Sequence, residues 1–115
     1  MSEERLPTEV WVMAQVRRCH QEGRPAFVLR KGDLRGGLVL LKVNRLDGTA
    51  LVLTQQRDLE GRLGWMVAVG KGPVAEAEAD AYLERATGRD PDLWLVEVED
   101  RRGEPPFEGP LITLG

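Results

Sequence analysis

The chain has 115 residues and predicts a single domain, because domains most often hold about 100 to 150 residues. Its one cysteine, Cys19, excludes an internal disulfide framework and is typical of a reducing compartment. A net charge of −3 lacks the strongly basic balance that general nucleic-acid affinity requires, so nucleic acid is disfavoured as a partner.

The N-terminal stretch MSEERLPTEV lacks the basic segment and apolar region of a signal peptide. The longest apolar runs, GGLVLL and LWLV, are far shorter than the roughly 20 residues of a membrane helix. We therefore expect a cytoplasmic protein with no membrane contact. Basic side chains outnumber acidic ones in residues 1–60, and the reverse holds in residues 61–115, which favours self-association through complementary patches.

Residues 6–23 predict the first helix, because apolar side chains recur there at spacings of three and four. Thr8 is placed to cap the N-terminus of this helix, and Gly23 is placed to end it. Trp11 lies at the edge of the apolar stripe, where it would cover one end of the core. The predicted buried stripe consists of Val12, Met13, Val16 and Cys19.

Four strands are predicted next, at residues 26–31, 38–44, 50–56 and 65–69, with glycine-bearing turns between them. Connections this short favour antiparallel neighbours, so we expect a four-strand meander. Leu38 and Leu40 make the second strand apolar on both faces, which indicates that both faces are covered. Two helices seldom cover both faces of such a sheet, so we expect a second subunit to supply part of the cover.

Residues 72–88 predict the second helix, with Pro73 in the first turn and Gly88 at the C-terminus. DPDLWLVEVED, residues 90–100, predicts the last strand, in which Glu97 and Glu99 share one face because strand side chains alternate. The tail, residues 101–115, is proline-rich and then apolar. Its LITL stretch would be loose or would extend a sheet edge, either its own or a neighbour's.

These elements predict one α+β domain in the order α-β-β-β-β-α-β, with a mainly antiparallel sheet and two helices packed on it. The predicted core spans about residues 6–100. The segments TEVWV, AFVLRKGDLRGGLVLLKV and DPDLWLVEVED, in this order, resemble a family of short bacterial proteins. That family is catalogued only as domain of unknown function fourteen-ninety-one and is associated with alphaproteobacteria. The resemblance covers about Leu6 to Asp100 and implies no role for any residue.

One enzymatic interpretation concerns KGDLRGGLVLLK. Restriction-endonuclease-like nucleases are built as a helix, a strand meander, a helix and a strand, with an Asp on one strand and an acid-x-Lys triplet on the next. The carboxylates hold Mg²⁺, and the lysine assists the attacking water. Asp33 and Lys42 resemble that Asp and Lys, and Glu9 would stand for a helix acid. Leu40, however, occupies the place of the second metal ligand, and a hydrocarbon does not bind a hard cation.

Glu97 and Glu99 are a second acidic candidate, because α-carbons two residues apart on a strand lie about 6.5 to 7 Å from each other. This spacing would serve a metal or an acid/base pair, but an exposed strand face is much the commoner explanation, so we interpret both acids as surface residues. If that face is covered, the acids need partners such as Arg17, Arg18 or Arg101.

Cys19 and His20 are neighbours on the first helix, where adjacent positions lie about 100° apart, so they do not face each other as a catalytic dyad must. We interpret Cys19 as a small core residue. With one histidine and one cysteine the chain assembles no Cys/His zinc set. The sequence therefore predicts no metal site and no cofactor.

The best binding candidate is LRKGDLRGG, which places Arg30, Lys31 and Arg35 around three glycines. Glycine-turn amides and arginines bind phosphate or carboxylate groups, although this pattern matches no P-loop. A hairpin turn with a solvated basic tip is the simpler explanation. We predict these three residues as a contact for an acidic or phosphate-bearing partner.

The function that the sequence favours is non-catalytic: a small cytoplasmic adaptor or regulatory domain that forms homo-oligomers and acts through protein–protein contacts. The alternative is a metal-dependent hydrolase or nuclease built on Asp33, Lys42 and one of Glu97 or Glu99. Convergence of these side chains would favour the alternative, and dispersal over separate faces would favour the adaptor.

Overall fold

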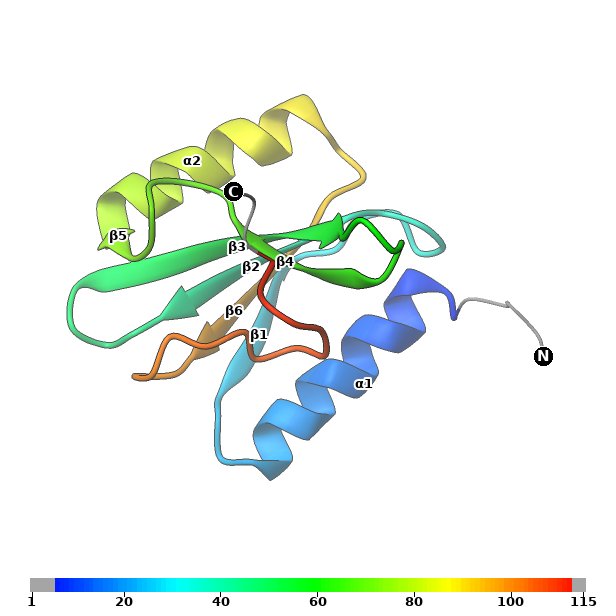
Figure 1. Ribbon diagram of the computed structural model, residues 1–115, viewed down its shortest axis with the longest axis horizontal. Helices are drawn as coiled ribbons and strands as arrows, with labels where there is room; N and C mark the ends of the chain where they lie inside the picture. Colours follow the sequence, from blue (N-terminus) through cyan, green and yellow to red (C-terminus); the bar gives the residue numbers. More distant parts are fainter. Residues whose placement is uncertain (1–5, 113–115) are drawn as a thin grey trace.

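A computed structural model describes residues 6–112, and its elements confirm the predicted α+β class and order. One two-residue strand is added before the second helix. Figure 1 shows the sheet with one helix on each side. The elements are α1 (Thr8–Gln21), β1 (Ala26–Arg30), β2 (Val39–Asn44), β3 (Thr49–Arg57), β4 (Leu63–Val67), β5 (Val74–Ala75), α2 (Glu76–Arg89) and β6 (Trp94–Glu99).

The sheet is mainly antiparallel, but it is not a simple meander. Its order is β1-β6-β2-β3-β4, with β5 paired to β3. β2, β3 and β4 form the expected antiparallel run, whereas β6 lies between β1 and β2 and is parallel to β2. The expected β1–β2 pairing was wrong because residues 31–38 form a connection long enough to cross an intervening strand, about 10 Å for two strand spacings.

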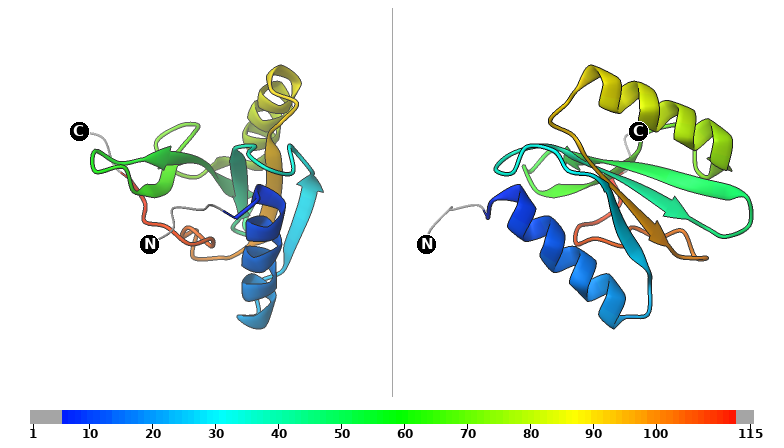
Figure 2. Two further views of the ribbon diagram at one scale, coloured as in Figure 1. Left: turned by 90° about the vertical axis from the view of Figure 1, so that its right-hand side faces the viewer. Right: turned by 180° about the vertical axis from the view of Figure 1, so that it is seen from behind.

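α1 covers one face of the sheet and α2 covers the other (Figure 2). The larger core lies under α1 and includes Trp65, Trp94 and Phe107. The smaller core lies under α2, where alanines at the contact let the helix approach the strands closely. Its buried residues are Leu40, Ala50, Val52, Ala79, Leu83, Ala86 and Leu93. α2 therefore supplies the cover over Leu40 that we expected from a second subunit.

The buried stripe of α1 differs from the prediction at one position. Met13 is 45% exposed, and Gln15 is buried in its place. The buried side chain of Gln15 has a hydrogen-bond partner, because its Oε1 accepts from the Glu108 backbone N–H at 2.8 Å. The N-terminus also differs, because Pro7 is the N-cap and the Thr8 hydroxyl donates to the Arg35 carbonyl at 3.2 Å. This bond ties the start of α1 to the β1–β2 connection.

The C-terminal segment extends the sheet edge of its own chain. The Trp65 N–H donates to the Pro110 carbonyl at 2.8 Å, and the Ile112 N–H donates to the Trp65 carbonyl at 2.7 Å. Leu111 bridges Trp65 in the parallel sense, so part of LITL pairs with β4. The rest of that stretch, residues 113 and 114, lies outside the described residues. Phe107, beyond the core boundary predicted near residue 100, is 1% exposed.

Leu46, in the β2–β3 turn, has a left-handed backbone with a φ of 65° and a side chain that is 43% exposed. A left-handed conformation costs a leucine roughly 1 to 2 kcal/mol, and asparagine tolerates it better. We expect Leu46→Asn to raise the free energy of unfolding by about 0.5 to 1 kcal/mol in urea titration. Leu59→Asn is the control, because Leu59 is fully exposed and has no positive φ. An equal gain in both variants would show that the effect comes from replacing an exposed leucine by a polar residue and not from relief of backbone strain.

Candidate functional site

Lys42 is the most enclosed charged side chain of the candidate residues. It lies on the α2 face of β2, and its side chain is only 5% exposed. Its Nζ donates to Glu76 Oε2 at 2.8 Å and to Asp80 Oδ1 at 2.7 Å, and it lies 3.7 Å from Glu97 Oε1. Lys42 and Glu97 are register partners on parallel strands, and both acids from α2 lie near its first turn. We call Lys42, Glu76, Asp80, Glu97 and Asn44 the Lys42 cluster.

Asn44 completes this cluster by joining the acids of two elements. Its Nδ2 donates to Glu97 Oε2 at 2.9 Å and to Glu76 Oε2 at 3.4 Å. Its Oδ1 accepts from the Leu46 N–H at 2.9 Å. The arginine partners that we considered for Glu97 are therefore replaced by a lysine and an amide from the neighbouring strand.

The protonation state of Lys42 limits what the cluster can do. Burial alone would lower the pKa of Lys42, but hydrogen bonds to Asp80 and Glu76 and the charge of Glu97 outweigh it, so the pKa is raised. Lys42 is therefore a cation at neutral pH and is unsuited to act as a general base. It serves as the counter-ion of three carboxylates and fastens α2 to the sheet.

Asp33 does not join Lys42. Its Oδ2 accepts from the Gly36 N–H at 2.8 Å, and its carbonyl accepts from the Trp94 indole at 2.7 Å. Along β6, Trp94 precedes Glu97, the register partner of Lys42, by three residues, or about 10 Å. The structure thus brings Lys42 and Glu97 together and leaves Asp33 apart. Within residues 6–112 no three His, Cys, Asp or Glu residues are grouped so as to hold a metal ion.

Glu99 and Glu9, the remaining acidic candidates, lie in different parts of the fold. Glu99 is half-buried one alternation beyond Glu97 and is the register partner of Asn44. Glu9 lies in the first turn of α1, where its carboxylate is 3.2 Å from the Lys31 ammonium. Neither side chain reaches the Lys42 cluster through a hydrogen bond in the described structure.

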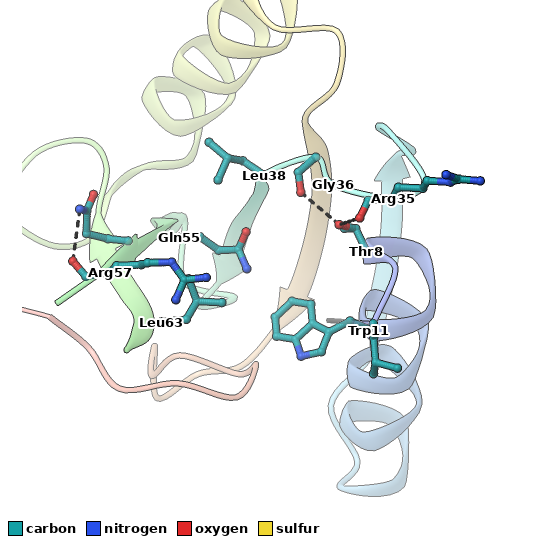
Figure 3. Close-up of a pocket in the computed structure, with 11 residues that line it drawn as sticks. Thr8, Trp11, Arg35, Gly36, Leu38, Gln55, Arg57 and Leu63 are labelled. Carbon is teal, nitrogen blue, oxygen red and sulfur yellow. Dashed lines mark hydrogen bonds between the residues drawn. The ribbon is translucent and has the colours of Figure 1, made fainter. Parts of the chain in front are cut away.

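The three predicted basic side chains do not converge on one site. Arg30 donates to the Pro91 carbonyl at 3.4 Å, and Lys31 pairs with Glu9. The Arg35 guanidinium points away from the neighbouring cavity, while its carbonyl accepts from Thr8 (Figure 3). The glycine turn holds the carboxylate of Asp33 on the Gly36 amide, so that amide is already occupied by an internal anion.

Cys19 and His20 behave as predicted from their helical spacing. Cys19 is fully buried, and burial raises the pKa of its thiol, which donates to the Pro106 carbonyl at 3.7 Å. His20 is exposed and its Nε2 lies 3.0 Å from the Ala26 carbonyl at the sheet edge. Cys19 is therefore a core residue, as interpreted from the sequence.

A cavity of about 690 Å³ opens beside Trp11. It lies where the start of α1, the end of the β1–β2 connection and the β3–β4 hairpin meet (Figure 3). Its lining residues are Leu6, Thr8, Trp11, Arg35, Gly36, Gly37, Leu38, Gln55, Gln56, Arg57 and Leu63. Sequence analysis missed this site because its members come from four separate segments. The clues were Trp11, at the edge of the helix stripe, and Arg35, a predicted binding residue whose turn forms part of the wall.

Two side chains of β3 present hydrogen-bond donors at this cavity. Gln55 Oε1 accepts from the Val39 N–H at 3.0 Å, which leaves its amide NH₂ to donate. Arg57 donates from Nη1 to the Gly61 carbonyl at 2.7 Å and keeps its other N–H groups. Trp11 stacks on Trp65 with ring centroids 6.4 Å apart, so its indole forms a fixed apolar wall.

This combination defines a small α+β domain with an internally neutralised lysine and an open, donor-lined cavity. The chain belongs to the family described as "Protein of unknown function (DUF1491)", whose model matches residues 6–108. No helix within the described range 6–112 is long and apolar enough to cross a membrane.

Solved structures of the same kind support the family assignment. A crystal structure of a DUF1491 family protein from Caulobacter crescentus CB15 is 42% identical, covers 94% of this chain and all of its own, and has a TM-score of 0.83. An NMR structure of a DUF1491 family protein from the same organism has a TM-score of 0.78, with 42% identity over 94% of this chain and 97% of its own. A solution structure from A. tumefaciens is 25% identical over 97% of this chain and 98% of its own, with a TM-score of 0.75. No curated protein matches this chain.

Proposed function

We propose that this chain is a non-catalytic adaptor that acts through protein–protein contacts, and that a partner segment binds in the cavity beside Trp11. The observation that carries the proposal is the cavity of about 690 Å³, in which an indole and three leucines adjoin donors from β3. Ligand sites commonly enclose about 300 to 1,000 Å³ and combine apolar walls with a few polar groups.

Binding is favoured over catalysis by the chemistry of the cavity wall. Among the described residues, those that line the cavity include no Asp, Glu, His, Cys or Lys. General acid/base and nucleophilic chemistry at neutral pH relies mainly on such groups. The Lys42 cluster contains charged groups, but its one cation is engaged by three carboxylates from β6 and α2. We therefore place the functional surface at the cavity and assign the cluster to stability.

The cavity proposal is tested by selecting peptide binders from a random library against the full chain. Binders should shift the amide resonances of residues that line the cavity. Leu38→Asp, a change to a half-exposed leucine of the wall, should weaken the selected peptides by at least about tenfold. Leu34→Asp is the matched control, because Leu34 is equally exposed in the same connection but lies outside the wall. Binders that shift only other surfaces would refute the cavity as the site.

Self-association is the second part of the proposed function. Phe27 and Leu29 are about half-exposed on β1, which is an edge strand of the sheet. Apolar side chains on a sheet edge are a common component of subunit contacts. Size-exclusion chromatography with light scattering should give a mass above that of the 12.8 kDa chain at high concentration. A monomer at every concentration would remove self-association and leave the cavity proposal intact.

A further inference from the structure

The cavity continues into a second hollow. This hollow measures about 760 Å³ and is bounded by the β3–β4 hairpin and by residues 108–110 of the C-terminal segment. Trp11, Arg57 and Leu63 line both spaces, so the two form one groove, which we call the Trp11 groove. A groove that passes over several elements suits an extended chain better than a compact small molecule.

We propose that the Trp11 groove binds an extended acidic peptide segment of a partner protein. An apolar side chain of the segment packs against Trp11, and a carboxylate is held by Arg57 and Gln55. This inference rests on the proposed function, and it adds the chemical class of the ligand and the residues that select it.

Arg57 is the cation best placed to select a carboxylate. Among residues 6–112 it forms no ion pair, and its one hydrogen bond leaves most of its N–H donors free. Arg62 of the second hollow differs, because it is paired with both Asp58 and Glu60. A guanidinium with free donors beside a partly apolar wall favours a carboxylate acceptor.

Gln55 supports the same polarity. Because its Oε1 is held by the Val39 N–H, the side-chain amide presents its NH₂ group to the cavity (Figure 3). The cavity thus offers donors and no carboxylate, whereas Glu108 lines the second hollow. We therefore place the acidic side chain of the ligand at the cavity end and its neutral part toward Glu108.

The test uses three blocked hexapeptides, each with two central leucines, two serines at one end, and two glutamates, two glutamines or two lysines at the other end. The isotope-labelled full chain is titrated with each, and affinities are taken from amide shifts. The glutamate peptide should bind at least about tenfold more tightly than the lysine peptide. The glutamine peptide, which has nearly the same shape, should be intermediate.

Three variants locate the carboxylate. Arg57→Glu should weaken the glutamate peptide by about tenfold or more and reverse the preference for it over the lysine peptide. Gln55→Glu keeps an acceptor for the Val39 N–H but removes the donor, so it should weaken the glutamate peptide by about threefold or more. Arg35→Glu reverses a charge at the basic tip and distinguishes that tip from Arg57. Arg85→Glu is the matched control and should change affinity by less than about twofold, because Arg85 is exposed on α2 and lines neither hollow.

The outcomes separate this inference from the function on which it rests. Equal binding of all three peptides in the groove, unchanged in Arg57→Glu, would overturn the acidic ligand and leave the cavity proposal standing. Failure of all three to shift any groove residue would count against both. Loss of binding in Arg35→Glu and not in Arg57→Glu would move the acid to the basic tip at Arg30, Lys31 and Arg35. Inorganic phosphate that reproduced the shifts at equal concentration would overturn the peptide as ligand.

Discussion

Replacing Phe107 by alanine is expected to lower the free energy of unfolding by about 3 to 5 kcal/mol, the usual cost of emptying a buried phenylalanine site. Phe107 is 1% exposed and meets Trp11 and Trp65 edge-on, with ring centroids 5.7 and 6.2 Å away. The Trp65 indole is held by its hydrogen bond to the Glu108 carbonyl at 3.0 Å and the Trp11 indole stacks on it, so neither ring is free to fill the space left by Phe107. The large effect therefore follows from a cavity between α1 and β4 that remains open.

Urea unfolding of Phe107→Ala checks this value, with Leu111→Ala as the control. Leu111 belongs to the same C-terminal segment but is half-exposed, so its truncation should cost less than about 1 kcal/mol. Equal small losses in both variants would mean that the segment unfolds separately from the core. The same experiment would then undermine the second hollow, which residues 108–110 help to form.

The C-terminal segment shows where sequence reasoning stops. Hydrophobic periodicity identifies a helix or strand from residues that are close in the sequence. The C-terminal segment, in contrast, is held by residues about 90 positions away. The Pro106 carbonyl accepts from Arg18 Nη2 at 3.0 Å, and the Glu108 N–H donates to Gln15 Oε1 at 2.8 Å. Such pairs leave no local pattern, so Phe107 could not be placed in the core from the sequence.

Both helices and five of the six strands were predictable because their periods of 3.6 and 2 follow from backbone geometry. The order of the strands in the sheet was not predictable in this way. Gly37 was interpreted as a turn residue, but a Cβ there would lie 2.0 Å from the Asp92 carbonyl oxygen. The glycine is needed because the start of β6 passes beneath the β1–β2 connection. Glycine is favoured both in turns and where distant backbone segments approach closely, so the sequence does not distinguish the two causes.

The candidate site was predictable only in part. Lys42 and Glu97 were both singled out, but their contact depends on parallel pairing of β2 with β6, which alternation within one strand cannot indicate. Glu76 and Asp80 both bind Lys42, but the sequence carries no signal for this contact, because acids near a helix N-terminus are favoured by the helix dipole alone. Arg57 received no role at all, because its position matters only through the groove that three other segments complete.

Lys42→Met is expected to lower the free energy of unfolding by about 2 to 4 kcal/mol at neutral pH, because it leaves three carboxylates without their cation. Methionine keeps the length and apolar packing of the lysine stem, so the change isolates the ammonium. The value lies toward the lower end for a broken buried ion pair, since Glu76 and Asp80 retain contact with water. Asp80→Asn is the control and should cost less than about 1 kcal/mol, because this acid is largely exposed.

The pH dependence of this difference has a definite sign. The pKa of Lys42 is raised above its ordinary 10.5, so its contribution to stability is complete below that pH and is lost as the pH rises through the folded-state pKa. Wild type and Lys42→Met should differ by a constant amount between about pH 7 and 10 and should converge above it. Matched urea titrations at several alkaline pH values measure this.

A Lys42→Met variant as stable as wild type at neutral pH would contradict the role of Lys42 as a counter-ion. The ammonium would then contribute no net stability in its present position among Glu76, Asp80 and Glu97. An enclosed lysine that does not stabilise the fold calls for a functional explanation, because burying a charge without benefit is costly. That result would favour a functional role for the Lys42 cluster. The expected loss of stability, which should disappear above the folded-state pKa, would assign the cluster to docking α2 and leave the Trp11 groove as the functional surface.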